Sequence, residues 1–306
     1  MAGPPNVARE LALLLLLSVV WGASYTFIRI GVTTIPPVTL IAARTFVAGL
    51  ILVGVMRSRG LRFPPLGPVW RQFVVQASLN SVVPFTLIAW AEQTIGAGLA
   101  TILNATTPVF AFLLTAFVAR HETVGRRKLF GVAAGLLGTC LIVGFNALSG
   151  LGQETWAQLG VIFATVCYAG AAILGRRFGH LDPIVAAAGS LICGAAILIP
   201  VSIIVDRPWT LTPSAVSILA LLALATVSTA LAFVIYFRLL QTLGSVGVTA
   251  QSYLRVPIGV AVGVVFLGER LTPTGWLGLG CVVAGVFAMT IPPGRSRLAG
   301  VQRQEM

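Results

Sequence analysis

The stretch HETVGRRKLFGVAAGLLG, residues 121–138, returns in altered form as GERLTPTGWLGLGCVVAG, residues 268–285. Each contains a glutamate followed by glycines nine and sixteen positions later; these are Glu122, Gly131 and Gly138, and Glu269, Gly278 and Gly285. QTIGA (93–97) and QTLGS (241–245) match in the same way upstream. The chain is therefore predicted to contain two related halves. We expect the glycine faces to permit close helix contact within the fold rather than across a dimer.

The composition of the chain indicates a membrane protein. Of its 306 residues, 57% are hydrophobic and only 9% are charged, and the mean hydropathy is +0.98. A soluble domain carries roughly 25% charged residues, so this chain has too few charges to cover a water-facing surface. We expect an all-α integral membrane protein that is embedded in the lipid bilayer.

Ten apolar runs are long enough to cross a bilayer, which takes roughly 20 residues. They cover about 11–31, 36–56, 70–91, 97–119, 127–146, 157–178, 183–205, 212–238, 245–267 and 274–291. Each half holds an odd number of runs, so the halves must lie in opposite orientations. The prediction is a first five-helix repeat (1–150), a second, inverted repeat (151–292) and a cytoplasmic tail (293–306).

Lysine and arginine are distributed unevenly between the segments that connect the runs. With the N-terminus inside, the outer segments hold only Arg29, Arg207 and Arg270, and most other basic residues fall in inner segments. This bias predicts that both termini are cytoplasmic. The net charge of +12 comes from short clusters between apolar runs rather than from one exposed face, so we expect no nucleic-acid partner.

Inverted repeats characterise secondary transporters, whose substrate site lies near the membrane midplane. The chain resembles the EamA type of the drug/metabolite transporter superfamily over nearly its whole length. The segments that carry the resemblance are WGASYTFIRIG (21–31), ARTFVAG (43–49), ATTPVFAFLLTAFVARHETV (105–124) and RVPIGVAVGVVFLGERLTPTGWLGLGCVVAG (255–285). The resemblance implies ten transmembrane helices, alternating access, a bacterial inner membrane, and export of amino acids or related metabolites.

Two prolines occupy equivalent places in the halves, Pro108 and Pro257. A proline inside a helix frees the carbonyl four residues back, here that of Asn104 or Tyr253. Helices broken at matching positions point to a transport site, although kinks satisfied by neighbouring helices would be purely structural. We include both prolines, both freed positions and the nearby polar Gln251 among the predicted substrate-binding residues.

Aromatic residues also fall near the middle of the runs. Trp21 and Tyr25 are four residues apart and share a helix face, and Tyr168 lies at the matching depth of the second half. Aromatic walls would suit flat or apolar solutes, with ordinary packing as the alternative. Asn80 is one of several polar residues inside the runs, where such groups need partners, and it completes this part of the predicted site.

Arg44 and Arg255 lie inside apolar runs, where each costs about 2.5–3.5 kcal/mol on the insertion scale. No acidic residue lies at their depth in the sequence, so neither has an evident ion-pair partner. We expect Arg255 to face a wet cavity and to bind an anionic group of the substrate. For Arg44 the sequence leaves two roles open, binding of the substrate and a structural role in which it clamps helices together.

The sequence offers no arrangement typical of catalysis, a cofactor or a metal. The eight Asp and Glu residues lie near run ends, and the two histidines lie in predicted loops. The four cysteines are dispersed in apolar segments without metal-ligand spacing. We therefore expect no enzyme activity. The sequence places no evident carboxylate inside the membrane for proton coupling, and a gradient-driven carrier is the simpler hypothesis.

The expected function is export of small organic metabolites through a midplane cavity. Amino acids, with a lean to large apolar or aromatic ones, fit the aromatic residues and Arg255 best. Alternatives are a multidrug carrier, a carrier of sugar phosphates or nucleotide sugars and, more remotely, a non-transporting membrane subunit. Whether the protein is a monomer or a dimer is left open.

Overall fold

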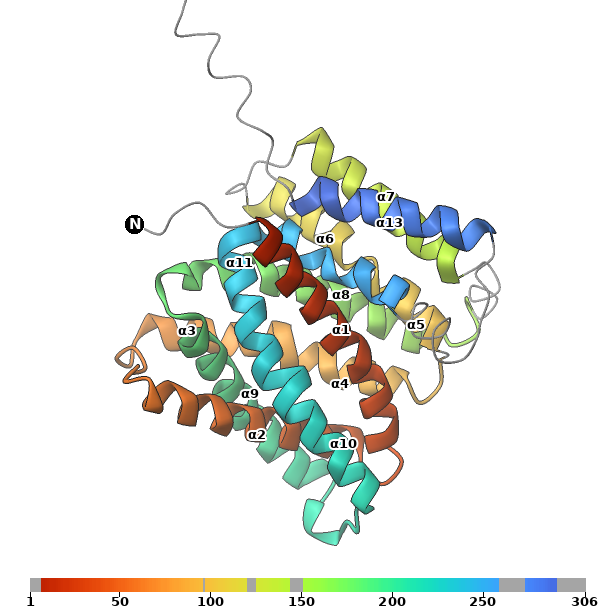
Figure 1. Ribbon diagram of the computed structural model, residues 1–306. Helices are drawn as coiled ribbons and strands as arrows, with labels where there is room; N and C mark the ends of the chain where they lie inside the picture. The colour runs from red at the N-terminus through yellow and green to blue at the C-terminus, as the bar shows by residue number, and fades with distance from the viewer. Residues whose placement is uncertain (1–6, 96, 120–124, 144–150, 259–272, 291–306) are drawn as a thin grey trace, which may run out of the picture.

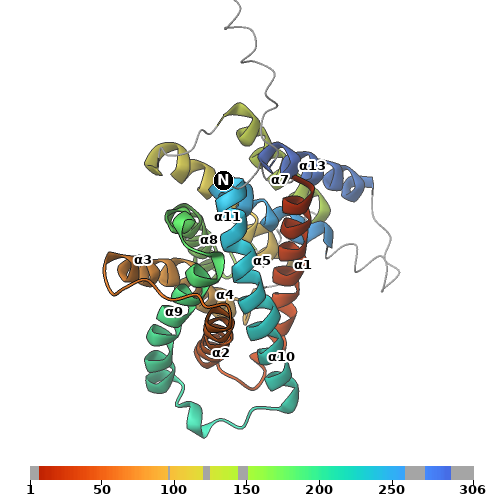
Figure 2. The same cartoon turned by 60° about the vertical axis from the view of Figure 1, so that its left-hand side comes forward.

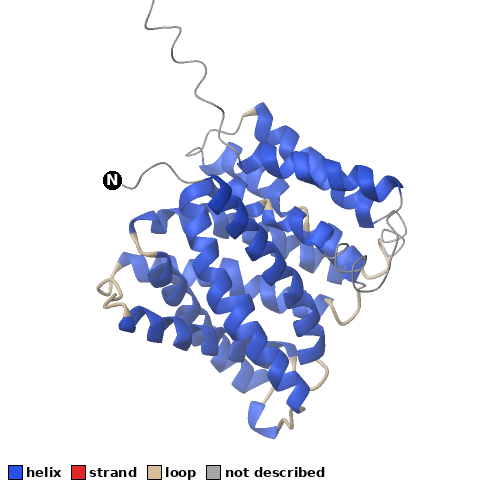
Figure 3. Ribbon diagram, viewed as in Figure 1, coloured by secondary structure: helices blue, strands red, loops and turns tan. Residues whose placement is uncertain are grey.

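The computed structural model describes residues 7–95, 97–119, 125–143, 151–258 and 273–290. Within these ranges every regular element is a helix and none is a strand, as Figure 3 shows. Helices suit a bilayer because each helix satisfies its own backbone hydrogen bonds without water. The all-α architecture expected from the composition is confirmed for this part of the chain.

Figure 1 shows the order of the helices along the chain. The first half contains α1 (Val7–Gly31), α2 (Pro37–Ser58), α3 (Pro68–Ala77), α4 (Val83–Ala91), α5 (Ala97–Asn104), α6 (Thr107–Leu114) and α7 (Arg126–Val143). The second contains α8 (Thr155–Gly175), α9 (Pro183–Val205), α10 (Ala215–Ala225), α11 (Ala232–Thr249) and α13 (Pro273–Thr290), and residues 251–258 are also helical. Short π-helical segments are η1 (Ser78–Val82), η2 (Thr115–Ala119) and η6 (Thr226–Leu231), and short 3₁₀ segments are η4 (Arg176–His180) and η5 (Pro208–Thr210).

Seven helical stretches in the described residues are long and apolar enough to cross a membrane. They are Val7–Gly31, Pro37–Ser58, Pro68–Ala91, Thr155–His180, Pro183–Val205, Ala215–Thr249 and Pro273–Thr290. A shorter apolar helix covers Ile102–Phe117. Parts of the predicted runs 127–146 and 245–267 lie outside the described residues. The count of ten spans and the inverted orientation of the halves therefore stay predictions.

The halves share an irregularity at the same place in the sequence. The π-helical segment η1 begins at Ser78, fifteen residues before Gln93 of QTIGA. Its counterpart η6 begins at Thr226, fifteen residues before Gln241 of QTLGS. A π-helical turn widens the helix locally and is often found at functional sites. Its recurrence supports the predicted division into two related halves.

The longest helical stretch, Ala215–Thr249, is interrupted at one residue. Gly244 has φ 77° and ψ 178°, which is not helical. Glycine reaches this positive φ without the steric penalty that a Cβ would bring. The sequence predicts that one run ends at about 238 and the next begins at about 245, so the interruption lies between the two predicted runs.

The helices α7 and α13 lie side by side in both views of the molecule (Figures 1 and 2). A Cβ atom on Gly138 would lie only 2.5 Å from the carbonyl oxygen of Gly278. A Cβ atom on Gly131 would likewise lie 2.8 Å from the carbonyl oxygen of Gly285. Because only glycine leaves room for such close backbone contact, the prediction that these glycines pack within the fold is confirmed.

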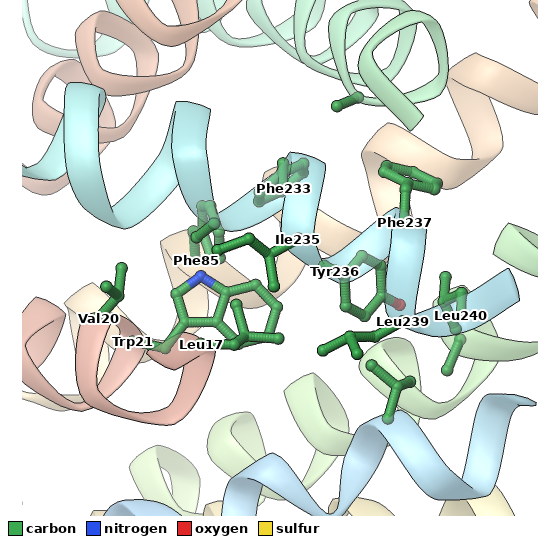
Figure 4. Packing of buried hydrophobic residues seen from close by; sticks show 14 of the residues in the cluster. Leu17, Val20, Trp21, Phe85, Phe233, Ile235, Tyr236, Phe237, Leu239 and Leu240 are labelled. Carbon is green, nitrogen blue, oxygen red and sulfur yellow. The ribbon is translucent and has the colours of Figure 1, made fainter. Parts of the chain in front are cut away.

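A cluster of aromatic rings joins α1, α4 and α11, as the close-up in Figure 4 shows. The rings of Trp21 and Tyr236 lie 5.5 Å apart between centroids, and those of Phe85 and Phe233 lie 6.3 Å apart in an edge-to-face arrangement. Such pairs add about 0.5–1.5 kcal/mol beyond the burial of their area. The cluster holds α1, α4 and α11 together.

Candidate functional site

A cavity lies among helices from both halves of the chain. The residues that line it are Trp21, Ser24, Tyr25, Ile28, Arg44, Asn80, Phe85, Ile88, Asn104, Thr107, Tyr168, Tyr236, Val248, Thr249, Gln251, Ser252 and Arg255. None of these lining residues carries a carboxylate.

The structure brings most of the predicted site residues together in this one cavity. Those that line it are Trp21, Tyr25, Arg44, Asn80, Asn104, Tyr168, Gln251 and Arg255. Pro108, Pro257 and Tyr253 lie outside the lining. Tyr253 is fully buried, and its hydroxyl donates to the carbonyl of Val132 at 2.9 Å, so it joins the helical residues 251–258 to α7.

Arg255 is half-buried in the cavity wall. Its Nε donates to Oε1 of Gln251 at 2.8 Å, and its Nη1 donates to the hydroxyl of Tyr25 at 3.2 Å. The guanidinium carbon lies 5.3 Å from the centre of the Trp21 ring and 5.9 Å from that of Tyr25, within range of cation–π attraction. Neutral groups and ring faces hold the charge in place, and no ion pair neutralises it in the described part of the chain.

Arg44 has a different environment, since only 1% of its surface is exposed. Its Nε donates to the hydroxyl of Thr229 at 2.5 Å, and its Nη2 donates to the carbonyl of Ser228 at 3.2 Å. The guanidinium also stacks on Phe85, with 4.1 Å between its carbon and the ring centre. These contacts tie α2 to η6 and α4, as a structural clamp would.

The carbonyl of Ser228 in η6 accepts two hydrogen bonds from other helices. Besides the bond from Arg44, it receives one from Nε1 of Trp21 at 3.1 Å. A π-helical segment shifts backbone hydrogen bonds from i+4 to i+5 and so leaves carbonyls open to outside donors. In return the Ser228 hydroxyl donates to the carbonyl of Val20 at 3.1 Å. The π-helical turn therefore holds α1 and α2 in place beside the cavity.

The chain is broken between α5 and α6, just before Pro108. The carbonyl of Asn104 accepts a hydrogen bond from the Thr107 hydroxyl at 2.8 Å, so this exposed backbone group is satisfied locally. The side-chain amide of Asn104 donates to the Tyr25 hydroxyl. In the second half the interruption falls at Ala250, and the helix continues from Gln251 through Pro257. The two breaks are thus not placed identically relative to their prolines.

Asn80 is buried in η1, with 3% of its surface exposed, and lines the cavity. Its Nδ2 group has no hydrogen-bond partner among the described residues. A buried amide left without a partner costs roughly 1–3 kcal/mol. Asn80 therefore contributes an unpaired hydrogen-bond donor to the residues around the cavity.

Several lining residues were not predicted from the sequence. They are Ser24, Ile28, Phe85, Ile88, Thr107, Tyr236, Val248, Thr249 and Ser252. The apolar members look like any other residue of a membrane helix, so composition carries no signal for them. For Phe85 and Ile88 the sequence offers one indication of a shared location: they are three residues apart and so lie on one face of α4.

Both halves of the chain match one known protein family. The model of the EamA-like transporter family matches the chain twice, over residues 8–144 and 155–291. The chain belongs to the EamA-like transporter family. It is accordingly a membrane transporter rather than an enzyme.

Two relatives cover nearly the whole chain. The protein named "Uncharacterized inner membrane transporter YedA" from Escherichia coli K12 is 28% identical over 90% of this chain and 88% of its own length. The protein named "Probable terminal-alkyne amino-acid exporter" from Streptantibioticus cattleyicolor is 26% identical over 90% of this chain and 91% of its own length. These names support a transport function and a location in a membrane.

A solved crystal structure shares the fold of this chain. It superposes with a TM-score of 0.71 at 18% sequence identity, over 90% of this chain and 96% of the other. At this level of identity the likeness concerns the arrangement of the helices alone. The likeness extends over both halves of the chain, from which the elements that form the cavity come.

Proposed function

We propose that this transporter exports small carboxylated metabolites, foremost amino acids with large apolar or aromatic side chains. The observation that carries the proposal is the Arg255 guanidinium, which lies in the cavity wall without an acidic partner among the described residues. Transport would proceed by alternating access of this cavity to the two sides of a bacterial inner membrane, with both termini in the cytoplasm.

Charge supports a carboxylate as the group bound at Arg255. A guanidinium offers five N–H donors in a fixed fork that matches a carboxylate. The hydrogen bonds of Arg255 to Gln251 and Tyr25 use Nε and Nη1 and go to neutral oxygens. A carboxylate in the cavity would therefore meet both the positive charge and further donors of the fork. The open Nδ2 donor of Asn80 would add a hydrogen bond to an acceptor on the same solute.

The aromatic lining of the cavity supports a large or flat side chain. Its aromatic lining residues are Trp21, Tyr25, Phe85, Tyr168 and Tyr236. Aromatic rings prefer offset or edge-to-face contact with other rings and gain about 0.5–1.5 kcal/mol per pair. They also attract a cation through the ring face, which suits the ammonium group of an amino acid.

The alternatives fit the lining residues less well. A site for lipophilic cations would favour a carboxylate in the wall, whereas the charged lining residues are Arg44 and Arg255. A sugar phosphate or nucleotide sugar carries more negative charge and would favour several free cations, but Arg44 is engaged by Thr229 and Ser228. Export, rather than import, is supported by the name of one relative, an amino-acid exporter at 26% identity.

A transport screen tests the proposal. Purified protein in liposomes would be loaded with labelled L-tryptophan, L-phenylalanine, L-leucine, L-alanine or L-tryptophanamide, and efflux would be followed. We expect the aromatic acids to leave fastest, and the amide, which lacks the carboxylate, to leave at least tenfold more slowly than L-tryptophan. No efflux of any amino acid, or equal efflux of the acid and its amide, would refute the proposed substrate class.

The same screen with Trp21→Ala and Tyr168→Ala tests the role of the aromatic wall. Each variant is expected to shift preference from aromatic towards small aliphatic solutes, because it removes ring contacts but leaves Arg255. An equal loss for every solute would instead assign these residues to packing.

A further inference from the structure

Glu92 follows the last residue of α4 and continues the face of that helix which lines the cavity. Phe85 and Ile88 of α4 are lining residues. The amide of Glu92 donates to the carbonyl of Ile88 at 2.9 Å, so the helical path extends to this residue. Positions i, i+3 and i+7 share one helix face, which places Glu92 one turn beyond the cavity wall. The predicted orientation makes this the outer end of the cavity.

Both carboxylate oxygens of Glu92 are shielded from solvent, and neither has a hydrogen-bond partner in the part of the chain that the structure describes. Glu10 offers a contrast within the same molecule. It is also buried, but Nη2 of Arg238 and the hydroxyl of Thr242 donate to its two oxygens at 3.0 and 2.9 Å. Burying an ionised carboxylate without partners costs several kcal/mol, and a proton on the carboxylate removes most of that cost.

Charged groups near Glu92 do not neutralise it by direct contact. Arg29 and Tyr25 on α1 and Arg44 on α2 lie within electrostatic range of the carboxylate. Arg29 is exposed, Arg44 is bonded to η6, and neither forms an ion pair with Glu92 among the described residues. The helix α8, which also packs against α4, carries the titratable groups Cys167 and Tyr168.

Glu92 lies directly after the membrane-spanning stretch Pro68–Ala91. Burial raises the pKa of Glu92 to about 8, and Arg29 and Arg44 lower it only in part. A carboxyl with a raised pKa holds its proton as the pH rises past its usual range of about 4 and loses it only above the raised value. The lack of hydrogen-bond partners and the raised pKa both indicate that the buried carboxyl of Glu92 is protonated near neutral pH.

We propose that Glu92 is a proton-binding site at the outer end of the transport cavity, and that the carrier exchanges exported solute for an incoming proton. In the outward-open state the Glu92 carboxylate binds an external proton through a new O–H bond after the solute has left. The neutral carboxyl can then be enclosed, as in this structure. When the cavity opens to the cytoplasm, that O–H bond breaks and the proton is released inside.

This inference adds an energy source to the proposed export and rests on the transport function, not on the identity of the solute. It also revises the expectation of a purely gradient-driven carrier. That expectation came from the position of Glu92 near a helix end in the sequence, which does not reveal that both carboxylate oxygens are buried beside the cavity.

Infrared titration of the purified protein tests the site without any solute. A protonated carboxyl has a C=O absorption that a carboxylate lacks, and the difference between wild type and Glu92→Gln isolates this one group. We expect the band to be present at pH 7 and to disappear around pH 8. Glu154→Gln removes an exposed acid near the same predicted side and serves as the matched control. A Glu92 that is ionised at pH 7 would overturn the proposal.

Transport driven only by a pH gradient tests the coupling. Vesicles with an acidic interior are supplied with labelled L-tryptophan at equal concentration on both sides. One-for-one exchange predicts accumulation of about tenfold for each unit of pH difference, because outward proton flow draws solute inward. Glu92→Gln should abolish accumulation but retain exchange of tryptophan for tryptophan, and Glu92→Asp and Glu154→Gln should still accumulate.

The two measurements separate this inference from the proposed substrate class. Accumulation that persists in Glu92→Gln, or that is absent in a wild type which exchanges tryptophan, would overturn proton coupling at Glu92. If wild type neither carries nor exchanges tryptophan, the substrate class fails, and the infrared titration still decides whether Glu92 binds a proton.

Discussion

The two arginines that line the cavity are held in different ways. Arg44 is completely enclosed, and its guanidinium contacts Thr229, Ser228 and the ring of Phe85. Arg255 is only half-buried and faces the cavity. An unpaired charge in the membrane costs several kcal/mol unless polar groups or water surround it. At Arg44 the protein supplies those groups, and at Arg255 we propose that the solute completes them.

Asn80 provides a sharp test at the scale of one residue. Replacing Asn80 by Leu removes an amide whose Nδ2 is buried without a described partner, so the thermal midpoint in detergent should stay the same or rise. Export of L-tryptophan should fall at least fivefold, because the solute loses a donor in the wall. Ser78→Ala, a half-buried position in the same π-helical segment that does not line the cavity, is the control. A lower midpoint with unchanged export would assign Asn80 to packing.

Sequence reasoning finds residues that break the pattern of their surroundings. An arginine or a tryptophan in the middle of an apolar run is conspicuous, and Trp21, Arg44 and Arg255 do line the cavity. Val248 also lines it, but it is an ordinary residue of a membrane helix. Which face of a helix meets the cavity depends on packing with other helices, which one sequence does not specify. Tyr253 shows the converse, a predicted site residue that is buried against α7.

At the scale of elements, π-helical turns and glycine contacts shape the site. The segment η6 offers the Ser228 carbonyl to Trp21 and Arg44, and η1 presents Asn80 to the cavity. Helical periodicity in a sequence cannot indicate such a local change of hydrogen bonding, so the runs were predicted and the π-helical turns were not. The close contact between α7 and α13 was predicted, because small residues repeated along one face of a helix let two helix backbones approach closely.

The contact between α7 and α13 can be tested by adding one methyl group. A Cβ on Gly138 would lie 2.5 Å from the Gly278 carbonyl oxygen, whereas a Cβ on Gly280 would meet no atom within 4 Å. Gly138→Ala is expected to destabilise the protein by about 1–3 kcal/mol through overpacking, seen as a lower thermal midpoint in detergent. Gly280→Ala should leave the midpoint unchanged. Equal midpoints for both variants would contradict this packing.

At the scale of the whole molecule, two matched halves surround one cavity. The family model matches each half separately, and the cavity takes Trp21 and Asn80 from the first and Tyr168 and Arg255 from the second. A site between repeats is accessible to either side when one half moves against the other. The number of runs in each half, together with the distribution of arginines, predicts that the halves are inverted.

Cysteine labelling in intact cells tests the inverted arrangement. The native cysteines are first replaced, and single cysteines are then introduced at exposed positions: Gly60, Gly179, Glu154 and Thr210. A membrane-impermeant thiol reagent should label Glu154→Cys and Thr210→Cys from outside, and Gly60→Cys and Gly179→Cys only after the membrane is opened. Labelling of Gly60→Cys in intact cells would contradict the predicted orientation.

The central claim is that Arg255 binds the carboxylate of the exported solute, and efflux of L-tryptophan from liposomes containing Arg255→Gln tests it most directly. Arg59→Gln, which removes an exposed arginine outside the cavity, is the matched control. We predict that Arg255→Gln inserts and folds as wild type does but exports L-tryptophan at least tenfold more slowly, with Arg59→Gln unaffected. Wild-type efflux of L-tryptophan by folded Arg255→Gln would contradict the account.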